Sequence, residues 1–292
     1  MNTIKTLFLI SLLTSLLLLI GYFVGGIGGI LGFLIIALAM NFIGYWFSDR
    51  LVLALARAKV VTPEEEPELH KIVDEQVRLA AIPKPKVFII RDQAPNAFAT
   101  GRSKKHASIA VTEGITRLLS REELGGVIAH ELAHVGNRDT LIMTIVAAIA
   151  TAISMIAWMV QWAAIFGGGR RDSREGNALG IIGLLVIAIV MPIVATLIQL
   201  AISRTREYQA DKTGAYTSGN PLALASALRK LKLGNKDRHL DVSKERLEPV
   251  SHLFIVNPLS GAGVVRLFST HPPFEERVAR LEAMGRQTLW PR

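Results

Sequence analysis

The chain has 292 residues, of which 50% are hydrophobic and 20% are charged, whereas an average soluble domain is about a quarter charged. This composition excludes a disordered or collagen-like chain and argues against an ordinary soluble enzyme. The 33 basic and 24 acidic residues give a formal charge of +9, which in so apolar a chain suits an anionic membrane surface, and we expect no nucleic-acid partner. The absence of cysteine excludes a disulfide framework and a thiolate metal site.

The first apolar stretch has no charged residue between Lys5 and Asp49. A glycine-rich turn at 25–29 divides it into two segments, Leu7–Val24 and Ile30–Phe47, each near the roughly 20 residues that cross a bilayer. No small-residue cleavage site follows the first segment, so we expect an uncleaved membrane hairpin rather than a secretory signal.

A second charge-free pair of segments lies at Thr140–Phe166 and Gly176–Ser203, on either side of a polar loop at 167–175. Both segments are long enough to cross a bilayer with some tilt, and a buried helical hairpin in a soluble core is the alternative. Basic residues follow the first hairpin, so the positive-inside rule places both termini and the polar body in the cytoplasm. The basic loop at 167–175 then lies on the other side, which is an exception to that rule.

The polar body at 60–139 carries the patterns of a mixed α/β fold. Apolar residues recur at helical spacing over 69–80, and the β-branched and aromatic run at 87–90 predicts a buried strand. Segments 96–100 and 107–112 flank a polar connection and predict a hairpin.

Helix starts are marked by their capping residues. Ser120 followed by Glu123 is a capping-box signature, which predicts a helix that runs to Val135. Asn220-Pro221 predicts a further helix by the N-cap and N1 preferences, and a last helix is expected over 273–285.

The capped helix carries the motif His130-Glu131-Leu132-Ala133-His134. Residues four apart share one face of a helix, so both imidazoles can bind one ion, and neutral imidazoles suit Zn²⁺. Glu131 lies about 100° round the helix, where it can take a proton from a metal-bound water without binding the metal. Such a motif arises by chance in about one chain in a hundred with this many histidines, so it predicts a hydrolytic site with one zinc ion.

A third ligand is expected from the chain that returns after the fourth apolar segment. Glu207 follows Ser203 by about one helical turn and Asp211 by about two, and both face the same side of that helix. The spacing leaves open which carboxylate binds the metal, and the other would accept a hydrogen bond from a ligating imidazole. A solvated helix face that balances nearby basic residues is the alternative.

Four motifs in this order resemble those of the HtpX-type membrane metalloproteases, which are related to the CAAX prenyl endoproteases. They are Asn-Ala-Phe-Ala-Thr-Gly at 96–101, the His-Glu-Leu-Ala-His helix with Asn137 and Asp139, Ser-Arg-Thr-Arg-Glu-Tyr-Gln-Ala-Asp at 203–211, and Ser-Thr-His-Pro-Pro at 269–273. The resemblance covers nearly the whole chain. It implies an α+β, predominantly helical fold, in which a zincin-like protease domain carries four transmembrane helices in two hairpins.

These segments divide the chain into four parts. We expect an N-terminal transmembrane hairpin at 1–48 and the first part of the catalytic domain, with the His-Glu helix, at 49–139. A second transmembrane hairpin follows at 140–203, and the second part of the catalytic domain, with the third zinc ligand, occupies 204–292.

The resemblance also implies roles for the site residues. It makes Glu207 the third zinc ligand beside His130 and His134, with Asp211 in support of the histidines. Glu131 is then the catalytic base that activates water and passes the proton to the leaving amine.

A second group must stabilise the tetrahedral oxyanion. One candidate is His271, which the resemblance places near the site, with a structural cap before Pro272-Pro273 as an equal alternative. The other candidate is Arg206, whose charge favours a salt bridge to Glu207 or another carboxylate. Asp139, just after the metal helix, is expected in the same surroundings.

For substrate binding, the resemblance suggests an exposed strand edge to which a peptide backbone adds as a further strand. Its residues are Asn96, Ala97, Phe98 and Ala99. Such pairing depends on main chain more than side chain and suits an enzyme that meets varied unfolded segments. A plain core strand is the alternative.

The function implied is a membrane-anchored zinc metalloendopeptidase of the bacterial inner membrane, which cuts misfolded or damaged membrane proteins at the cytoplasmic surface during stress. Its expected partners are these substrates, the lipid bilayer and a membrane quality-control protease complex. One alternative is a protease that cleaves inside the bilayer, which the charged residues around the metal helix disfavour. The other is a zinc-binding membrane scaffold without peptidase activity, for which the sequence offers no obvious fourth ligand.

Overall fold

The computed structural model of the protein describes residues 2–143, 204–234, 253–255 and 272–286. Nearly all of the second apolar pair, Thr140–Phe166 and Gly176–Ser203, therefore lies outside the described residues, as do the loop at 167–175 and His271.

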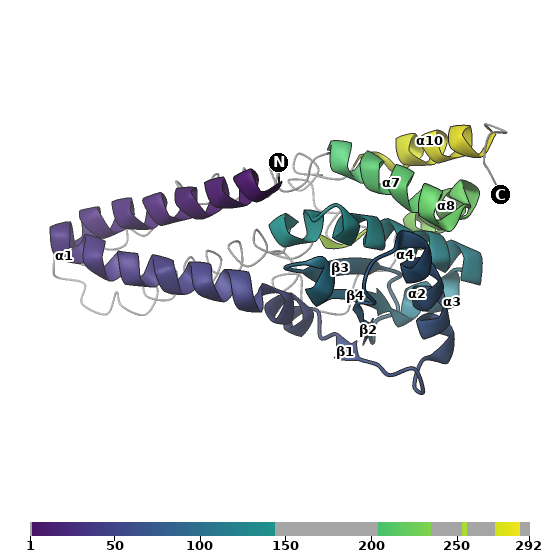
Figure 1. Ribbon diagram of the computed structural model, residues 1–292, viewed down its shortest axis with the longest axis horizontal. Coiled ribbons are helices and arrows are strands. Elements are labelled where there is room, and N and C mark those ends of the chain that lie inside the picture. Colours follow the sequence, from purple (N-terminus) through teal and green to yellow (C-terminus); the bar gives the residue numbers. More distant parts are fainter. Residues whose placement is uncertain (1, 144–203, 235–252, 256–271, 287–292) are drawn as a thin grey trace, which may run out of the picture.

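The chain begins with α1 (Asn2–Leu55), which runs out from the body, reverses and returns to it (Figure 1). Gly26 has a φ of 57°, in the left-handed region that glycine adopts at little cost, and it falls within the predicted turn at 25–29. Over the part of the chain that the structure describes, no helix qualifies as a membrane span by length and apolarity together. The four predicted spans stay a prediction.

Four strands form one mixed sheet in the order β1-β2-β4-β3. The central pair β2 and β4 is parallel, and the two outer pairings are antiparallel, so the predicted hairpin is present and places β3 at an edge. The sequence did not predict β1, whose two exposed residues carry no pattern. The strands are β1 (Lys59–Val60), β2 (Lys86–Ile90), β3 (Ala97–Gly101) and β4 (Ala107–Thr112).

Among the described helices of the body, α4 contacts α2, α7 and α8, and it also contacts the edge strand β3. In Figure 1, α7, α8 and α10 lie together at the end of the molecule away from the bend of α1. The helices are α2 (Pro67–Ala80), α3 (Glu113–Leu118), α4 (Arg121–Gly136), α7 (Arg204–Ser218), α8 (Pro221–Gly234) and α10 (Phe274–Arg286).

The predicted helix caps are confirmed. Ser120 and Glu123 form a reciprocal capping box, in which the Ser120 amide donates to Glu123 Oε2 at 2.8 Å and α4 begins at the next residue. The side chain of Asn220 accepts from the amide of Ala223 at 3.0 Å and starts α8. These caps fix where α4 begins and so where its later residues face.

The core packs α4 against the sheet on one side and against α2 and α8 on the others. Its fully buried members include Ile109 of β4, Val127 and Ile128 of α4, and Leu224 and Leu228 of α8. A helix enclosed in this way has little freedom to shift, because packed cores are dense. The residues of α4 that face away from this core are therefore held in fixed positions.

Candidate metal centre

The two helices that carry the predicted ligands touch at backbone level. A Cβ on Gly214 of α7 would lie 2.8 Å from both the Cα and the N of His130 on α4, closer than real Cβ contacts allow. Glycine therefore lets α7 approach α4 at the metal motif itself. Glu207 lies seven residues before Gly214, about two turns along the same helix face.

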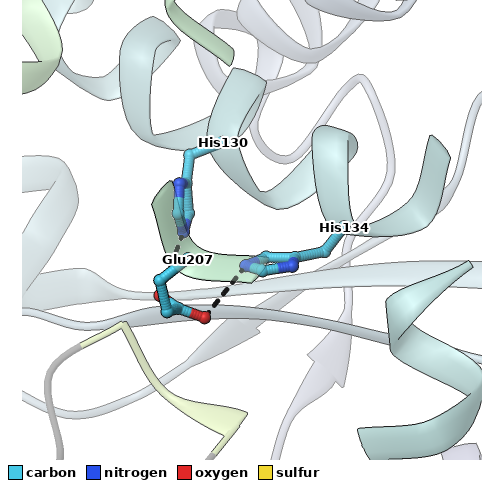
Figure 2. A group of neighbouring side chains, drawn as sticks. All are labelled: His130, His134 and Glu207. Carbon is cyan, nitrogen blue, oxygen red and sulfur yellow. Dashed lines mark ion pairs between the residues drawn. The ribbon is translucent and has the colours of Figure 1, made fainter. Parts of the chain in front are cut away.

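Three side chains converge across this contact. His134 Nε2 lies 3.4 Å from Glu207 Oε1, and His130 Nε2 lies 3.8 Å from Glu207 Oε2. Figure 2 shows the three side chains pointing toward one another, and the two imidazole rings stand nearly perpendicular, at 88°. One ligand atom from each residue lies within 4.8 Å of the others, and all three residues are buried.

The spacing of these atoms fits a small cation. Ligand atoms about 2.0–2.1 Å from a tetrahedral zinc ion lie about 3.3 Å from each other. The observed 3.4 and 3.8 Å between the imidazole nitrogens and Glu207 are close to that edge length. The three side chains therefore lie close enough together for one small cation to bind between them.

The other ring nitrogen of each histidine faces a carboxylate. His130 Nδ1 lies 3.0 Å from Asp211 Oδ1, and His134 Nδ1 lies 3.3 Å from Asp139 Oδ2. In the neutral form of each ring, the carboxylate favours the proton on Nδ1, and the Nε2 atom that faces Glu207 is then free to bind a cation. Spacing alone could not rank Glu207 and Asp211, but the structure separates them, with Glu207 at the Nε2 atoms and Asp211 behind His130.

The charges of the buried centre do not balance by themselves. Four buried carboxylates and two buried guanidinium groups leave two formal negative charges, because four minus two is two. Buried charge is stable only when it is paired or bound to a metal. One divalent cation would neutralise the excess. The carboxylates are Glu131, Asp139, Glu207 and Asp211, and the guanidinium groups are Arg206 and Arg277.

Protons neutralise the same excess when no metal is bound. Burial raises the pKa of Glu131 to about 8, and the charge of Glu207 adds to the effect. Burial alone would lower the pKa of His134, but the carboxylates of Asp139 and Glu207 outweigh it and raise the pKa to about 9. Burial lowers the pKa of His130, with opposition from Asp211. At pH 7 the metal-free centre therefore carries protons on Glu131 and His134.

Glu131 faces the edge of the sheet. Its Oε2 accepts a hydrogen bond from the amide of Ala99 in β3 at 2.8 Å. Because the core fixes both α4 and β3, this hydrogen bond holds the Glu131 carboxyl group in one orientation. A carboxyl group with a pKa near 8 can both take and return a proton near neutral pH.

Arg206 is buried beside the carboxylates. Burial lowers the pKa of its guanidinium, and the charges of Asp139 and Glu207 oppose that shift. The side chain therefore lies within the electrostatic reach of both carboxylates. Both predicted roles of Arg206, a salt bridge to a carboxylate and a contact with the oxyanion, stay predictions.

The predicted substrate strand forms the outer strand of the sheet, but the protein already uses part of its edge. The carbonyl of Ala97 accepts from the amide of Ile255 at 3.0 Å, and the ring of Phe98 packs edge-on against Phe254 at 4.9 Å. The amide of Ala99 is turned away from β4, toward Glu131. The carbonyl of Ala97 and the amide of Ala99 therefore already have partners within the protein, and substrate pairing with Asn96–Ala99 stays a prediction.

Sequence reasoning missed Arg277, which is fully buried and binds Asp211 through two hydrogen bonds of 2.8 and 2.7 Å. A signal was present in the helical spacing. Arg277 lies four residues before the buried Leu281 and next to the buried Val278, so it falls on the inward face of α10. A charged residue on an apolar face requires a buried partner.

A buried His-His-Glu group beside a proton-carrying glutamate, on a helix packed against a small mixed sheet, defines a metallopeptidase. Residues 63–285 match peptidase family M48. A protein of Desulfatibacillum aliphaticivorans named Protease HtpX homolog is 53% identical to this chain. The match covers 96% of this chain and 89% of the length of that protein. Proteins of the same name are 51% identical in Pyrococcus furiosus (97% and 96% covered) and 53% identical in Thermodesulfovibrio yellowstonii (98% and 100%).

The chain therefore belongs to peptidase family M48 and is an HtpX-type metalloprotease. The crystal structure of S. mikatae Ste24p has a similar fold, with a TM-score of 0.54 over 96% of this chain at 19% identity. This chain spans 65% of that structure's chain, just under two thirds of its length. That likeness shows the fold alone.

Proposed function

We propose that the protein is a zinc endopeptidase that cuts misfolded or damaged membrane proteins at the cytoplasmic surface of a bacterial inner membrane. The convergence of His130, His134 and Glu207 beside Glu131 is the observation that carries the catalytic part of this proposal. The four-part division of the chain, the role in stress and an association with a quality-control protease complex belong to the same proposal.

The chemistry follows from the positions of the side chains. A zinc ion held by His130, His134 and Glu207 would supply a Lewis acid that polarises the peptide carbonyl and acidifies a water molecule. Glu131 takes a proton from the attacking water and returns it to the leaving amine. We keep His271 as a candidate for stabilising the oxyanion, although it lies outside the described residues.

Attachment to a membrane is supported by the surface of α1. Its described residues expose many large apolar side chains, and exposed apolar patches of this kind mark contact with lipid or protein. Arg102, in the turn between β3 and β4, packs its guanidinium over the ring of Trp46 at 4.5 Å, which ties the returning end of α1 to the sheet. The exposed side chains include Ile27, Leu31, Ile35, Leu38, Phe42 and Ile43.

The test of membrane attachment is extraction of cell membranes with alkaline carbonate. An anchored protein stays in the membrane pellet and is released only by detergent. Release into the carbonate supernatant would contradict the anchor and leave the peptidase chemistry untouched.

The test of the peptidase is zinc-triggered cleavage. Protein purified in detergent with a chelator is expected to be inactive, and addition of zinc to start both self-digestion and cleavage of an unfolded substrate such as casein. Zinc binding without cleavage of any unfolded substrate would favour a scaffold. Cleavage confined to the transmembrane segments of substrates would favour cutting inside the bilayer.

Zinc binding at pH 7 is expected to release about two protons, one from His134 and one from Glu131, because a cation favours the unprotonated form of both. Affinity for zinc therefore rises with pH until both groups have lost their protons, above about pH 9. Calorimetry in two buffers of different ionisation enthalpy measures the release. The Glu131→Gln variant should release one proton fewer, and binding without proton release would contradict the assignment.

A further inference from the structure

Arg277 is among the largest fully buried side chains of the described residues, and it comes from α10, outside the motifs that carry the chemistry. Its Nε donates to Asp211 Oδ2 at 2.8 Å and its Nη2 to Asp211 Oδ1 at 2.7 Å. This bidentate geometry fixes both the position and the plane of the carboxylate, which a single hydrogen bond cannot do.

Asp211 passes this constraint on to a metal-binding ring. The oxygen that accepts from Arg277 Nη2, Oδ1, also lies 3.0 Å from His130 Nδ1. A series of side-chain contacts therefore runs from Arg277 through Asp211 to the imidazole of His130. With the carboxylate held at Nδ1, His130 Nε2 faces Glu207 Oε2 at 3.8 Å, and Arg277 Nη2 lies within hydrogen-bond distance of the same nitrogen at 3.4 Å.

We propose that Arg277 is a positioning residue of the metal centre, which orients His130 through Asp211 and makes metal binding depend on the docking of α10. The inference rests on the proposed metal site. Arg277 has no exposed surface, so it contacts no substrate. Its two hydrogen bonds to Asp211, at 2.8 and 2.7 Å, are shorter than its contacts with His130 and Glu207, at 3.4 and 3.6 Å, which makes Asp211 its main route to the metal centre.

Two effects of Arg277 on a bound cation oppose each other. Its Nη1 lies 3.6 Å from Glu207 Oε2 and its Nη2 lies 3.4 Å from His130 Nε2, so its positive charge borders the ligand atoms and repels a cation. The carboxylate of Asp211 neutralises most of that charge at closer range. Loss of a hydrogen-bonding partner behind a ligand typically weakens metal binding about 10–100-fold, so orientation should exceed repulsion.

Arg277→Lys separates the two effects because lysine keeps the charge and loses the bidentate contact. If Arg277 positions His130, the lysine variant binds zinc about 10-fold or more weakly, and Arg277→Gln binds it about 10–100-fold more weakly. If only charge matters, the lysine variant keeps the wild-type affinity and the glutamine variant binds zinc more tightly.

The experiment measures zinc dissociation constants by chelator competition on the full chain in detergent. The absorption spectrum of the cobalt-substituted protein reports the geometry of the centre. Arg280→Gln is the matched control, because Arg280 lies on the same helix and packs over Tyr208 of α7, yet it is exposed and does not contact Asp211. This control should keep the wild-type affinity within about twofold, as surface substitutions usually do.

A second comparison tests the route through Asp211. Arg277→Gln added to Asp211→Asn should weaken zinc binding little beyond Asp211→Asn alone, because residues that act in one chain are not additive. Additive losses would overturn the route. If Arg277→Gln does not fold, the Arg277→Lys variant alone tests the proposal. A folded variant with the wild-type zinc affinity and the wild-type cobalt spectrum would overturn it. Failure of the wild type to cleave peptides would contradict the proposed function and leave these binding measurements valid.

Discussion

Glu131→Gln is expected to lower peptidase activity at least 10²–10⁴-fold, the usual contribution of a positioned acid–base group. Glutamine has nearly the same shape and can still accept from the amide of Ala99, but it cannot take a proton from water. The three residues that could bind a metal are unchanged, so zinc affinity should stay within a few-fold of wild type. Turnover of an unfolded substrate and chelator competition measure the two quantities on one preparation.

His130→Ala is the paired control. It removes one of the three converging side chains and should lose zinc binding and activity together. Full activity of purified Glu131→Gln protein would contradict the assignment of Glu131 as the catalytic base. Loss of zinc binding in Glu131→Gln would instead indicate that the carboxylate helps to hold the metal.

The stability of metal-free Glu131→Gln gives an independent check on the raised pKa. The Glu131 carboxyl has an ordinary pKa of 4.5 and a pKa of about 8 in the folded protein. Between these two pH values the unfolded chain loses the proton while the folded protein keeps it, which lowers the free energy of unfolding. Glu131 therefore lowers the stability of the fold by nothing below pH 4.5 and by an increasing amount as the pH rises to about 8. At pH 8 the variant should therefore be more stable than wild type by on the order of a few kcal/mol, and this difference should vanish near pH 4.5.

Local patterns predicted most of the elements around the centre. The cap at Ser120 and the run at 87–90 involve neighbours in sequence, and both predictions are confirmed. The helix α3 was missed because its six residues, capped by Thr112, are too few to show a periodic pattern. The spacing of His130 and His134 placed both rings on one face without any knowledge of the fold.

The remaining features of the centre depend on contacts between distant segments. Asp211 and Arg277 are 66 residues apart, and no local rule pairs them. The distinction between Glu207 and Asp211 depends on how far α7 is shifted along α4, which spacing within α7 cannot reveal. That shift is set where Gly214 meets the backbone of His130.

Gly214→Ala is expected to remove most zinc binding and activity, although it adds one methyl group and alanine is the better helix former by about 1 kcal/mol. The new Cβ would lie 2.8 Å from the Cα and N of His130, so the backbones of α4 and α7 must separate. Overpacking of this kind typically costs about 1–3 kcal/mol. The separation also carries Glu207 and Asp211 away from the imidazoles, so we expect zinc affinity to fall at least about 10-fold.

Gly136→Ala supplies the matched control on the other helix of the contact. No atom lies within 4 Å of a Cβ built at Gly136, so the substitution should leave zinc affinity unchanged and the fold equal or slightly more stable. Thermal unfolding of the metal-free proteins separates a loss of fold from a loss of ligand geometry. A Cβ only 2.8 Å from the backbone of His130 must push α7 away from α4, so a folded Gly214→Ala protein with wild-type zinc affinity would show that this contact does not set the position of Glu207.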